Sequence, residues 1–461
     1  MTANYFYFAL IIAILNSPFT QAQEIINTLQ GGEFEFNSSK TPCLSHGQRA
    51  DLLEAVENNV QELKLQNKLI HPNREGGHPL FSWPVNQASG FNFESVWGIS
   101  NYVDENPAFP NQITDYNCGI RSYDTSSGYN HQGIDVFTWP FGWKQMDDGQ
   151  AIITAASPGQ IVFKSDGNFD RNCAFNNDNW NAIFIQHSDG SRAWYGHLKN
   201  GSITSKGIGD TVDNGEYLGV IGSSGNSTGP HLHFEVFDDS NQLVDTYFGP
   251  CNTFNPDTWW ASQKPYLNPN LNAVLTHSAP PIFPPCPVTE VPNTSDQFNN
   301  GELVYLAIYM RDQAAGTTVN LTVRRPNNSI FDEWTFNLTD NYAASYWYWS
   351  GIPDMDGGWT WEASYNGQTV EHDFNVGVLG VDEENLKNTV IYPNPVHEEL
   401  QISSEHTIVN IEIRDMLGRR VQEVNDEHIT KISTQAFLTG MYFIRLTSED
   451  NKSKTIKFIK R

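Results

Sequence analysis

The chain has 461 residues, which is more than one hydrophobic core of roughly 100 to 200 residues takes up, so several domains are expected. Its 53 acidic residues outnumber its 27 basic residues, and the formal net charge is −26 at pH 7. Nucleic acid and anionic membrane surfaces repel a chain of this charge, so both are excluded as partners.

The first 22 residues have the features of a secretory signal peptide. An apolar run from about Phe6 to Leu15 is followed by small and polar residues that end at Ala22. This run is shorter than the roughly 20 residues that a membrane-spanning helix needs, and no later segment is apolar enough to cross a membrane. We therefore expect a signal peptide at 1–22 and an exported, soluble mature protein without a membrane span.

Residues 23–80 are expected to form an N-terminal helical region or pro-segment. The stretch that begins at Ser45 places apolar residues on one helical stripe and contains no Gly or Pro after Gly47, which predicts a helix. The residues of the stripe are Leu53, Val56, Val60 and Leu63.

The five cysteines are widely spaced and form no CxxC, which favours disulfides over a cysteine zinc site. One cysteine must remain unpaired, and five choices of it with three pairings each give fifteen arrangements. The sequence does not choose among them. The cysteines are Cys43, Cys118, Cys173, Cys251 and Cys286.

The rest of the chain reads as short strands and turns, which predicts a mainly β protein. Runs such as AIITAA, QIVFKS and HLHFEVF are rich in β-branched and aromatic residues and alternate with Gly, Asn and Asp. A proline-dense stretch predicts a stiff linker, and the alternating runs after it are typical of an immunoglobulin-like sandwich that acts as a spacer or binding module. The predicted parts are a compact antiparallel β-sheet domain at 81–266, a Pro-rich linker at 267–292, a β-sandwich at 293–377, a linker at 378–390 and a small C-terminal β-domain at 391–461.

The C-terminal part resembles the sorting domain of the type IX secretion system. The resemblance rests on YPNP at Tyr392–Pro395, LGR at Leu417–Arg419, GMYFIRL at Gly440–Leu446 and the basic terminal strand KTIKFIKR. It implies export through the periplasm and across an outer membrane, with the type IX secretion machinery as partner and a secreted or cell-surface product. The alternative is one more sandwich domain.

Five residues in three short stretches have the pattern of a metal site: His131, Asp135, His197, His231 and His233. Side chains on a strand alternate between its faces, so His231 and His233 in HLHFEVF share one face. His131 and Asp135 lie four residues apart, and Gly133 with the run IDVF favours a strand over a helix there. Imidazoles with one carboxylate suit zinc, and a catalytic zinc takes three protein ligands and leaves a position for water. The spacing alone leaves open which three bind.

The remaining histidines are expected to be structural or surface residues, and His187 is expected to be a buried hydrogen-bonding residue near the site. The others are His46, His71, His78, His277, His372, His397, His406 and His428.

Residues 81–266 resemble the lysostaphin-type, or β-lytic, zinc endopeptidases. The motifs are HxGID at His131–Asp135, YGHL at Tyr195–Leu198 and GNSTGPHLHFEV at Gly225–Val236. The resemblance implies that His131, Asp135 and His233 bind one Zn²⁺ and that His197 and His231 are the catalytic histidines.

The family's domain is a compact antiparallel β-fold with a groove over the metal, so the loops Trp139–Trp143 and Gly222–Gly229 are expected to line that groove. The insertion FTWPFGWKQMDDGQ after Asp135 is longer and more aromatic than the family pattern, which leaves the specificity open. Residues 24–80 match no part of the catalytic domain and are expected to be a pro-segment over the groove or a helical docking element. Some relatives are held latent by a residue at the open zinc position, and the sequence assigns no residue to that role.

The sequence therefore predicts a secreted zinc metalloendopeptidase that hydrolyses peptide bonds by a zinc-activated water, most simply in peptidoglycan cross-links or stem peptides. One alternative is an extracellular protease that cuts glycine-rich proteins. Others are a non-catalytic wall-binding or amidase-regulating relative, and an adhesin whose working part is the sandwich. The presence of all five metal-site and catalytic groups favours an enzyme.

Overall fold

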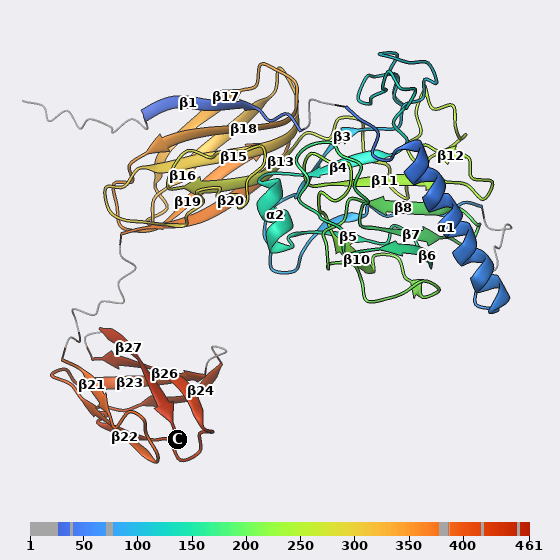
Figure 1. Ribbon diagram of the computed structural model, residues 1–461. Coiled ribbons are helices and arrows are strands. Elements are labelled where there is room, and N and C mark those ends of the chain that lie inside the picture. Colours follow the sequence, from blue (N-terminus) through green and yellow to red (C-terminus); the bar gives the residue numbers. More distant parts are fainter. Residues whose placement is uncertain are drawn as a thin grey trace, which may run out of the picture. The chain divides into compact units, whose positions relative to one another are not determined.

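The computed structural model describes residues 26–36, 40–70, 77–377, 386, 388–415, 419–449 and 452–461, and the predicted signal peptide lies outside them. The described chain is mainly β, as predicted, and divides into two compact units at residues 376 and 377 (Figure 1). Within the described residues no helix has both the length and the apolar character needed to cross a membrane.

The central part of the chain is built on an antiparallel sheet in the order β3-β4-β11-β8-β7-β6-β9, with β12 beside β11. Leu232, Phe234 and Val236 of β11 enter the main core on one face, so the alternation predicted for this strand is present. The strands of this sheet are β3 (Trp97–Asn101), β4 (Ile134–Thr138), β6 (Gly159–Ser165), β7 (Ala182–Gln186), β8 (Arg192–Gly196), β9 (Thr211–Val212), β11 (His231–Phe237) and β12 (Leu243–Val244). A smaller antiparallel sheet contains β10 (Tyr217–Val220), β5 (Ala151–Thr154) and β2 (Val85–Gln87).

Two further sheets form a sandwich around a core of aliphatic and aromatic residues, in which Trp349, Trp359 and Trp361 are almost completely buried. The first sheet has the order β1-β18-β15-β13, and the second has the order β14-β20-β19-β16-β17. Their strands are β1 (Ile26–Glu33), β13 (Asn270–His277), β14 (Gln297–Phe298), β15 (Val304–Gln313), β16 (Thr318–Arg324), β17 (Ile330–Asn337), β18 (Tyr342–Gly351), β19 (Gly357–Tyr365) and β20 (Gln368–Val376).

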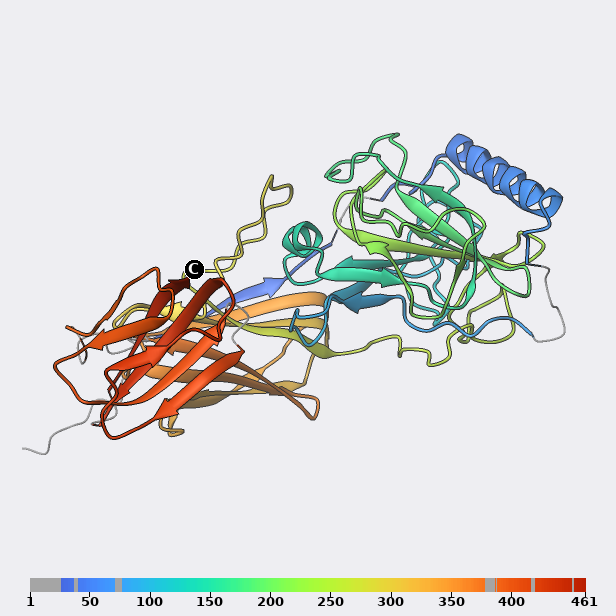
Figure 2. The same ribbon diagram turned by 90° about the horizontal axis from the view of Figure 1, so that it is seen from below.

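Two segments differ from the sequence predictions. The predicted linker at 267–292 contains the strand β13, so the prediction is wrong for that stretch. β13 pairs along its length with β15 and belongs to the sandwich. The predicted N-terminal helical region also begins with a strand, because β1 pairs antiparallel with β18 at the edge of the sandwich (Figure 2). Both strands find their partners far along the chain, which a local pattern does not reveal.

The predicted helix is present as α1 (His46–Leu65). The Ser45 side chain caps its N-terminus, and Gln48 returns a hydrogen bond in a capping box. Val56, Val60 and Leu63 are buried in a cluster with Val162, Phe184 and Trp194, so α1 packs on the β6-β7-β8 part of the sheet.

The aromatic insertion after Asp135 joins the central domain to the sandwich. It contains the short helix α2 (Gly142–Asp148), and Trp139 and Phe141 pack in a cluster with Ala307, Tyr309 and Tyr348 of the sandwich. The Trp139 indole N–H donates to the Met310 carbonyl over 3.1 Å. The expectation that Trp139 lines a groove is therefore wrong, since its side chain is completely buried at this contact.

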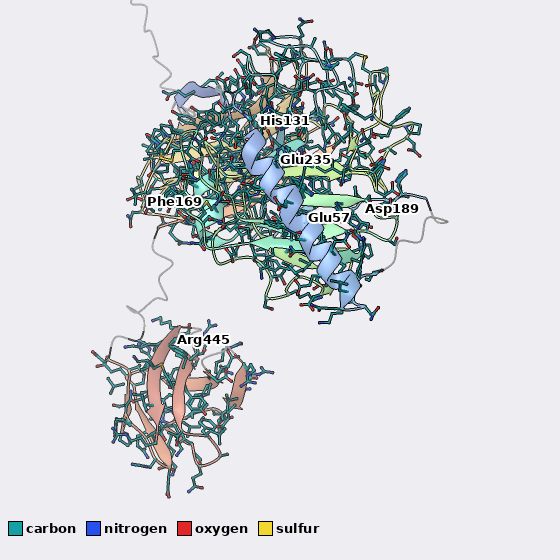
Figure 3. All side chains as sticks on the ribbon, turned by 45° about the vertical axis from the view of Figure 1, so that its right-hand side comes forward. Glu57, His131, Phe169, Asp189, Glu235 and Arg445 are labelled. Atoms are coloured by element: carbon teal, nitrogen blue, oxygen red, sulfur yellow. A yellow bond between two sulfur atoms is a disulfide. The ribbon has the colours of Figure 1, made fainter. Side chains whose placement is uncertain are left out.

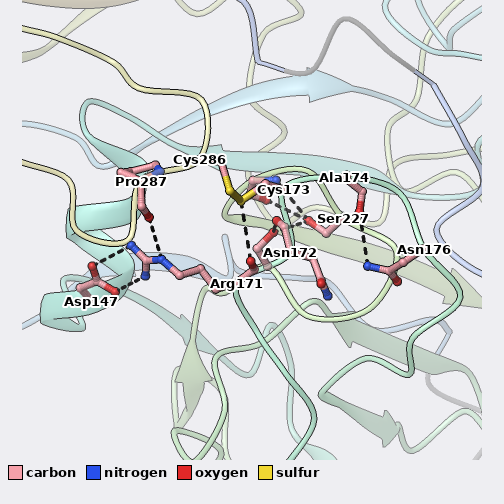
Figure 4. Close-up of a disulfide and its surroundings, with 11 residues drawn as sticks. Asp147, Arg171, Asn172, Cys173, Ala174, Asn176, Ser227, Cys286 and Pro287 are labelled. Carbon is pink, nitrogen blue, oxygen red and sulfur yellow. Dashed lines mark hydrogen bonds and ion pairs between the residues drawn. A yellow bond between two sulfur atoms is a disulfide. The ribbon is translucent and has the colours of Figure 1, made fainter.

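Two disulfides are present among the described residues, Cys118–Cys251 and Cys173–Cys286, and Cys43 is free and buried. Figure 4 shows that Cys173–Cys286 ties a loop of the central domain to the segment after β13. Beside it, the Arg171 guanidinium pairs with Asp147 at 2.6 Å and donates to the Pro287 carbonyl over 2.9 Å.

The second unit is a small β-domain around a core that includes Ile411, Ile444 and Phe458. Its sheets have the orders β21-β22-β25 and β24-β23-β26-β27. The strands are β21 (Val390–Tyr392), β22 (Glu399–Ser403), β23 (Ile408–Asp415), β24 (Arg420–Asn425), β25 (Lys431–Ser433), β26 (Gly440–Ser448) and β27 (Ser453–Lys460).

Candidate metal centre and active site

Strand register brings the five predicted site residues together. His233 of β11 lies directly opposite Asp135 of β4, and on its other side it lies opposite Gly196, the last residue of β8. His197 follows β8 immediately, and His131 precedes β4 by three residues. Three neighbouring strands and their ends thus bring side chains that are far apart in the sequence to one place on the sheet.

Three of these residues form a tight cluster of possible metal ligands. His131 Nε2 lies 3.0 Å from Asp135 Oδ2, and His233 Nδ1 lies 2.9 Å from Asp135 Oδ1. Gly133 lies between the two halves of HxGID, and a Cβ there would come within 2.7 Å of the His233 ring. The glycine therefore permits the close approach of His233 to this loop.

Hydrogen bonds donated by the outer ring N–H groups fix the orientation of each imidazole. The Nδ1–H groups of His131, His197 and His231 donate to the carbonyls of Tyr102, Ser224 and Gly229 over 2.8, 2.6 and 2.9 Å. His233 is turned the other way, because its Nε2–H donates to the Glu235 carboxylate over 3.1 Å. Such partners are typical of metal-binding or catalytic histidines, since they fix the tautomer and direct the remaining nitrogen inward.

His197 and His231 form a second pair beside the first cluster, with ring centroids 4.4 Å apart. His197 has a left-handed backbone with φ of 64°, a conformation that non-glycine residues rarely adopt and that is enriched at functional sites. Burial lowers the pKa of His197, and the neighbouring His231 lowers it further, so His197 is neutral near pH 7. Its Nε2 is buried and makes no well-directed hydrogen bond among the described residues.

The electrostatics of the cluster favour positive charge at its centre. Burial raises the pKa of the Asp135 carboxyl, but the charge of His131 outweighs this and holds the pKa well below its usual range. Burial likewise lowers the pKa of His131, but the Asp135 carboxylate outweighs it and raises the pKa to about 9. An almost completely buried anion thus attracts cationic partners here, and a divalent cation would meet the same requirement.

The residues present fit a zinc ion. His131, Asp135 and His233 offer two imidazole nitrogens and one carboxylate oxygen, the donor types that zinc prefers. His131 Nε2 is buried and makes no well-directed hydrogen bond despite its short distance to Asp135. Asn101 Nδ2 donates to Asp135 Oδ2 over 3.0 Å and so orients the carboxylate.

The structure also adds residues that sequence reasoning missed. Cys43 Sγ lies within 4.8 Å of the ligand atoms of His131, Asp135 and His233, and the same sulfur forms a second group with His197 and His231. The odd number of cysteines indicates that one of them is unpaired, but it does not identify Cys43 as that one. Glu235 continues the alternation of His231 and His233 on β11, and that periodicity does predict its face.

Glu235 connects the site to α1. Its side chain is 0% exposed, and Arg49 on α1 binds it through two nitrogens, at 2.5 Å and 3.1 Å. Figure 3 shows α1 running across the face of the domain where His131 and Glu235 lie. The helix therefore contacts the side chain that orients His233.

A groove of about 620 Å³ is lined by Gly142 and Trp143 of one loop expected to line it and by Thr228 and Gly229 of the other, with Pro230 beside them. Phe34 and Phe36 from the N-terminal segment also lie in its wall. His187 is buried and donates to the Pro158 carbonyl over 2.8 Å, as expected of a buried hydrogen-bonding residue.

Two parts of the chain match known protein families. Residues 129–245 match the model of peptidase family M23, and residues 390–461 match that of a secretion system C-terminal sorting domain. The chain is 34% identical over 157 residues to glycyl-glycine endopeptidase ALE-1 of Staphylococcus capitis, which covers 34% of this chain and 34% of that protein. It is 39% identical over 106 residues to the DD-carboxypeptidase/endopeptidase Mpg of Neisseria meningitidis serogroup B, which covers 23% of this chain and 20% of that protein.

Among solved structures, the chain is similar to the catalytic domain of lysostaphin from Staphylococcus simulans. The two are 26% identical, the match covers 35% of this chain and 95% of the lysostaphin domain, and its TM-score is 0.20. The chain spans about a third or less of the length of the two curated relatives.

Proposed function

We propose that the chain is a secreted zinc metalloendopeptidase, because residues 129–245 match the model of peptidase family M23 and residues 390–461 match that of a secretion system C-terminal sorting domain. The observation that carries this is the convergence of His131, Asp135 and His233 as ligands beside His197 and His231. Bound zinc would lower the pKa of a water molecule and polarise a carbonyl group.

The two further histidines supply the proton chemistry. His197 is neutral near pH 7, and both rings are held by hydrogen bonds from Nδ1–H to backbone carbonyls, so each directs Nε2 toward the ligands. A ring whose proton is on Nδ1 takes the proton of the attacking water at its free Nε2. A ring that carries a proton on both nitrogens donates a hydrogen bond from Nε2–H to the oxygen of the tetrahedral intermediate. Asn101 and Glu235 hold the Asp135 and His233 side chains in the orientation that this needs.

The proposed substrates are cross-links or stem peptides of peptidoglycan. Two relatives carry the names of a glycyl-glycine endopeptidase and a DD-carboxypeptidase/endopeptidase, so both glycine and D-alanine bonds belong in the test. The sorting domain supports export by the type IX secretion machinery, across the outer membrane to the medium or the cell surface.

The test uses the exported protein recovered from culture medium, loaded with zinc and mixed with purified sacculi or with a glycine-rich protein. New amino groups should appear on sacculi, a chelator should abolish them, and mass spectrometry should identify the bond. His231→Ala should lose activity and keep its zinc, whereas His131→Ala should lose the metal as well. His78→Ala is the matched control, because His78 lies outside the site and stacks on Trp259. Zinc-loaded protein from the medium that cleaves neither material would refute the proposal.

A further inference from the structure

A short stretch between β1 and α1 crosses the candidate metal site. We call residues 34–36 and 40–44 the strap. Phe36 stacks on Phe137 with ring centroids 4.9 Å apart and meets the His231 ring edge-on at 5.5 Å. The Pro42 carbonyl accepts a hydrogen bond from Asn226, and the Thr41 carbonyl accepts one from the Tyr123 hydroxyl over 3.3 Å. The strap is therefore bound to the floor and wall of the active site.

The strap places the Cys43 side chain next to the candidate metal ligands. Its sulfur lies 3.5 Å from His233 Nδ1 and 3.6 Å from the Tyr123 hydroxyl, and its side chain is 5% exposed. A buried free cysteine ordinarily packs as a small apolar residue. Here the sulfur instead lies among ligand atoms of His131, Asp135 and His233, at the mutual distances of groups that share one ion.

A second observation points to an ion or ligand at the same place. Nε2 of His131 and Nε2 of His197 are both buried without a well-directed hydrogen bond, and both belong to a group that includes the Cys43 sulfur. The space left between Phe36, Cys43, Asp135 and His231 has a volume of about 10 Å³. That is about the least that holds one water molecule, so no substrate peptide fits while the strap is seated.

We propose that Cys43 is the fourth zinc ligand of a latent form of the enzyme, and that the strap excludes substrate until it is withdrawn. The inference rests on the proposed zinc site. With Cys43 bound as thiolate, its proton released to solvent, the ligands are two imidazoles, one carboxylate and one thiolate. Four protein ligands make a closed site of the structural kind, whereas the three without Cys43 leave the open position that catalysis needs.

The strap is anchored at both ends. On one side β1 pairs with β18, with Gln30 opposite Tyr348 and Glu33 opposite Ser345. On the other side Cys43 lies two residues from Ser45, the N-cap of α1, and Arg49 holds α1 to Glu235. The sandwich therefore holds the end of the strap near Phe34, and α1 holds the end near Cys43.

The first test replaces zinc by Co²⁺ in the full chain, because a thiolate ligand gives a sulfur-to-cobalt charge-transfer band. Wild type should bind one Co²⁺ with this band, and its free thiol should react with Ellman's reagent only after a chelator is added. Cys43→Ser should bind one Co²⁺ without the band. Phe36→Ala is the matched strap variant, and it should keep the band because the thiolate remains.

The second test is activity on sacculi. Zinc-loaded Cys43→Ala should cleave at least about tenfold faster than full-length wild type. Each 1.4 kcal/mol by which the closed state loses stability raises the population of the open state tenfold. One bound Co²⁺ without the band in wild type would overturn the role of Cys43 and leave the proposed peptidase intact. No bound Co²⁺ in either protein would refute both.

Discussion

The Arg49–Glu235 ion pair should be among the strongest single contributions to the seating of α1. The Glu235 side chain is 0% exposed and the Arg49 side chain is 16% exposed, so the pair lies largely out of water. Removing one partner of such a pair leaves a buried charge and typically costs about 3–5 kcal/mol. Arg49→Met keeps the apolar stem that lies near the Trp194 ring and removes only the charge and its hydrogen bonds.

We therefore expect Arg49→Met to lower the free energy of unfolding by about 3–5 kcal/mol near neutral pH, measured by urea denaturation. Burial raises the pKa of Glu235, and Arg49 more than offsets this in the wild type, where the pKa lies below its usual range. Without Arg49 the pKa of Glu235 rises. The difference in free energy of unfolding between wild type and Arg49→Met should therefore shrink as the pH falls and Glu235 takes up a proton.

Two further variants test the electrostatic cause. Arg49→Met with Glu235→Gln should recover most of the loss, because the amide oxygen still accepts from His233. Arg192→Met is the matched control on the same interface, where the guanidinium lies 3.9 Å from the half-exposed Glu57, and it should cost about 1 kcal/mol or less. An Arg49→Met protein within about 1 kcal/mol of wild type at neutral pH would refute the reasoning.

Two other predictions concern the sandwich and its contact with the central domain. Trp139→Ala should lower the free energy of unfolding by about 3–5 kcal/mol in calorimetry or denaturation, because it empties a completely buried site between the sandwich and the central domain. Trp143→Ala, in the groove wall, should lower the free energy of unfolding by less. Burial lowers the pKa of His277 to about 4, so its stabilising contribution of about 3 kcal/mol is present above pH 6.5 and lost as the pH falls toward 4. His277→Gln should flatten the fall in stability between those pH values, and an unchanged slope would contradict this assignment.

The core of the site follows from local sequence because it is built from periodicity. Alternation along HLHFEVF puts His231 and His233 on one face, and the apolar residues between them enter the core as that pattern requires. The same rule extends to Glu235. Which strand lies opposite His233 is a matter of register between distant segments, and the family motif rather than the spacing linked His233 to Asp135.

The pairing of the N-terminal segment could not be predicted from local sequence. Nothing in the run INTLQGGE of β1 indicates that its partner lies more than 300 residues later, because pairing at that separation is decided by the exposed edge of β18. The strand β13 was hidden for a related reason, since the prolines that follow it dominate the composition of the segment. The position of Cys43 depends on both, as it is fixed by where the chain enters α1 and by the strap before it.

The two anchors of the strap should differ in their effect on Cys43. Cys43 is only two residues from the N-cap of α1, so the thiolate stays at a high effective concentration at the metal while the helix is docked. Gly31→Val should detach β1, because a Cβ at Gly31 would lie 2.1 Å from the Tyr346 carbonyl oxygen and the backbone there has φ of 131°. We expect Cys43 in the zinc-loaded Gly31→Val protein to remain as slow toward Ellman's reagent as in wild type, and Arg49→Met to speed its reaction, because only the latter loosens the helix. The reverse order would mean that the sandwich holds the thiolate in place and that α1 does not.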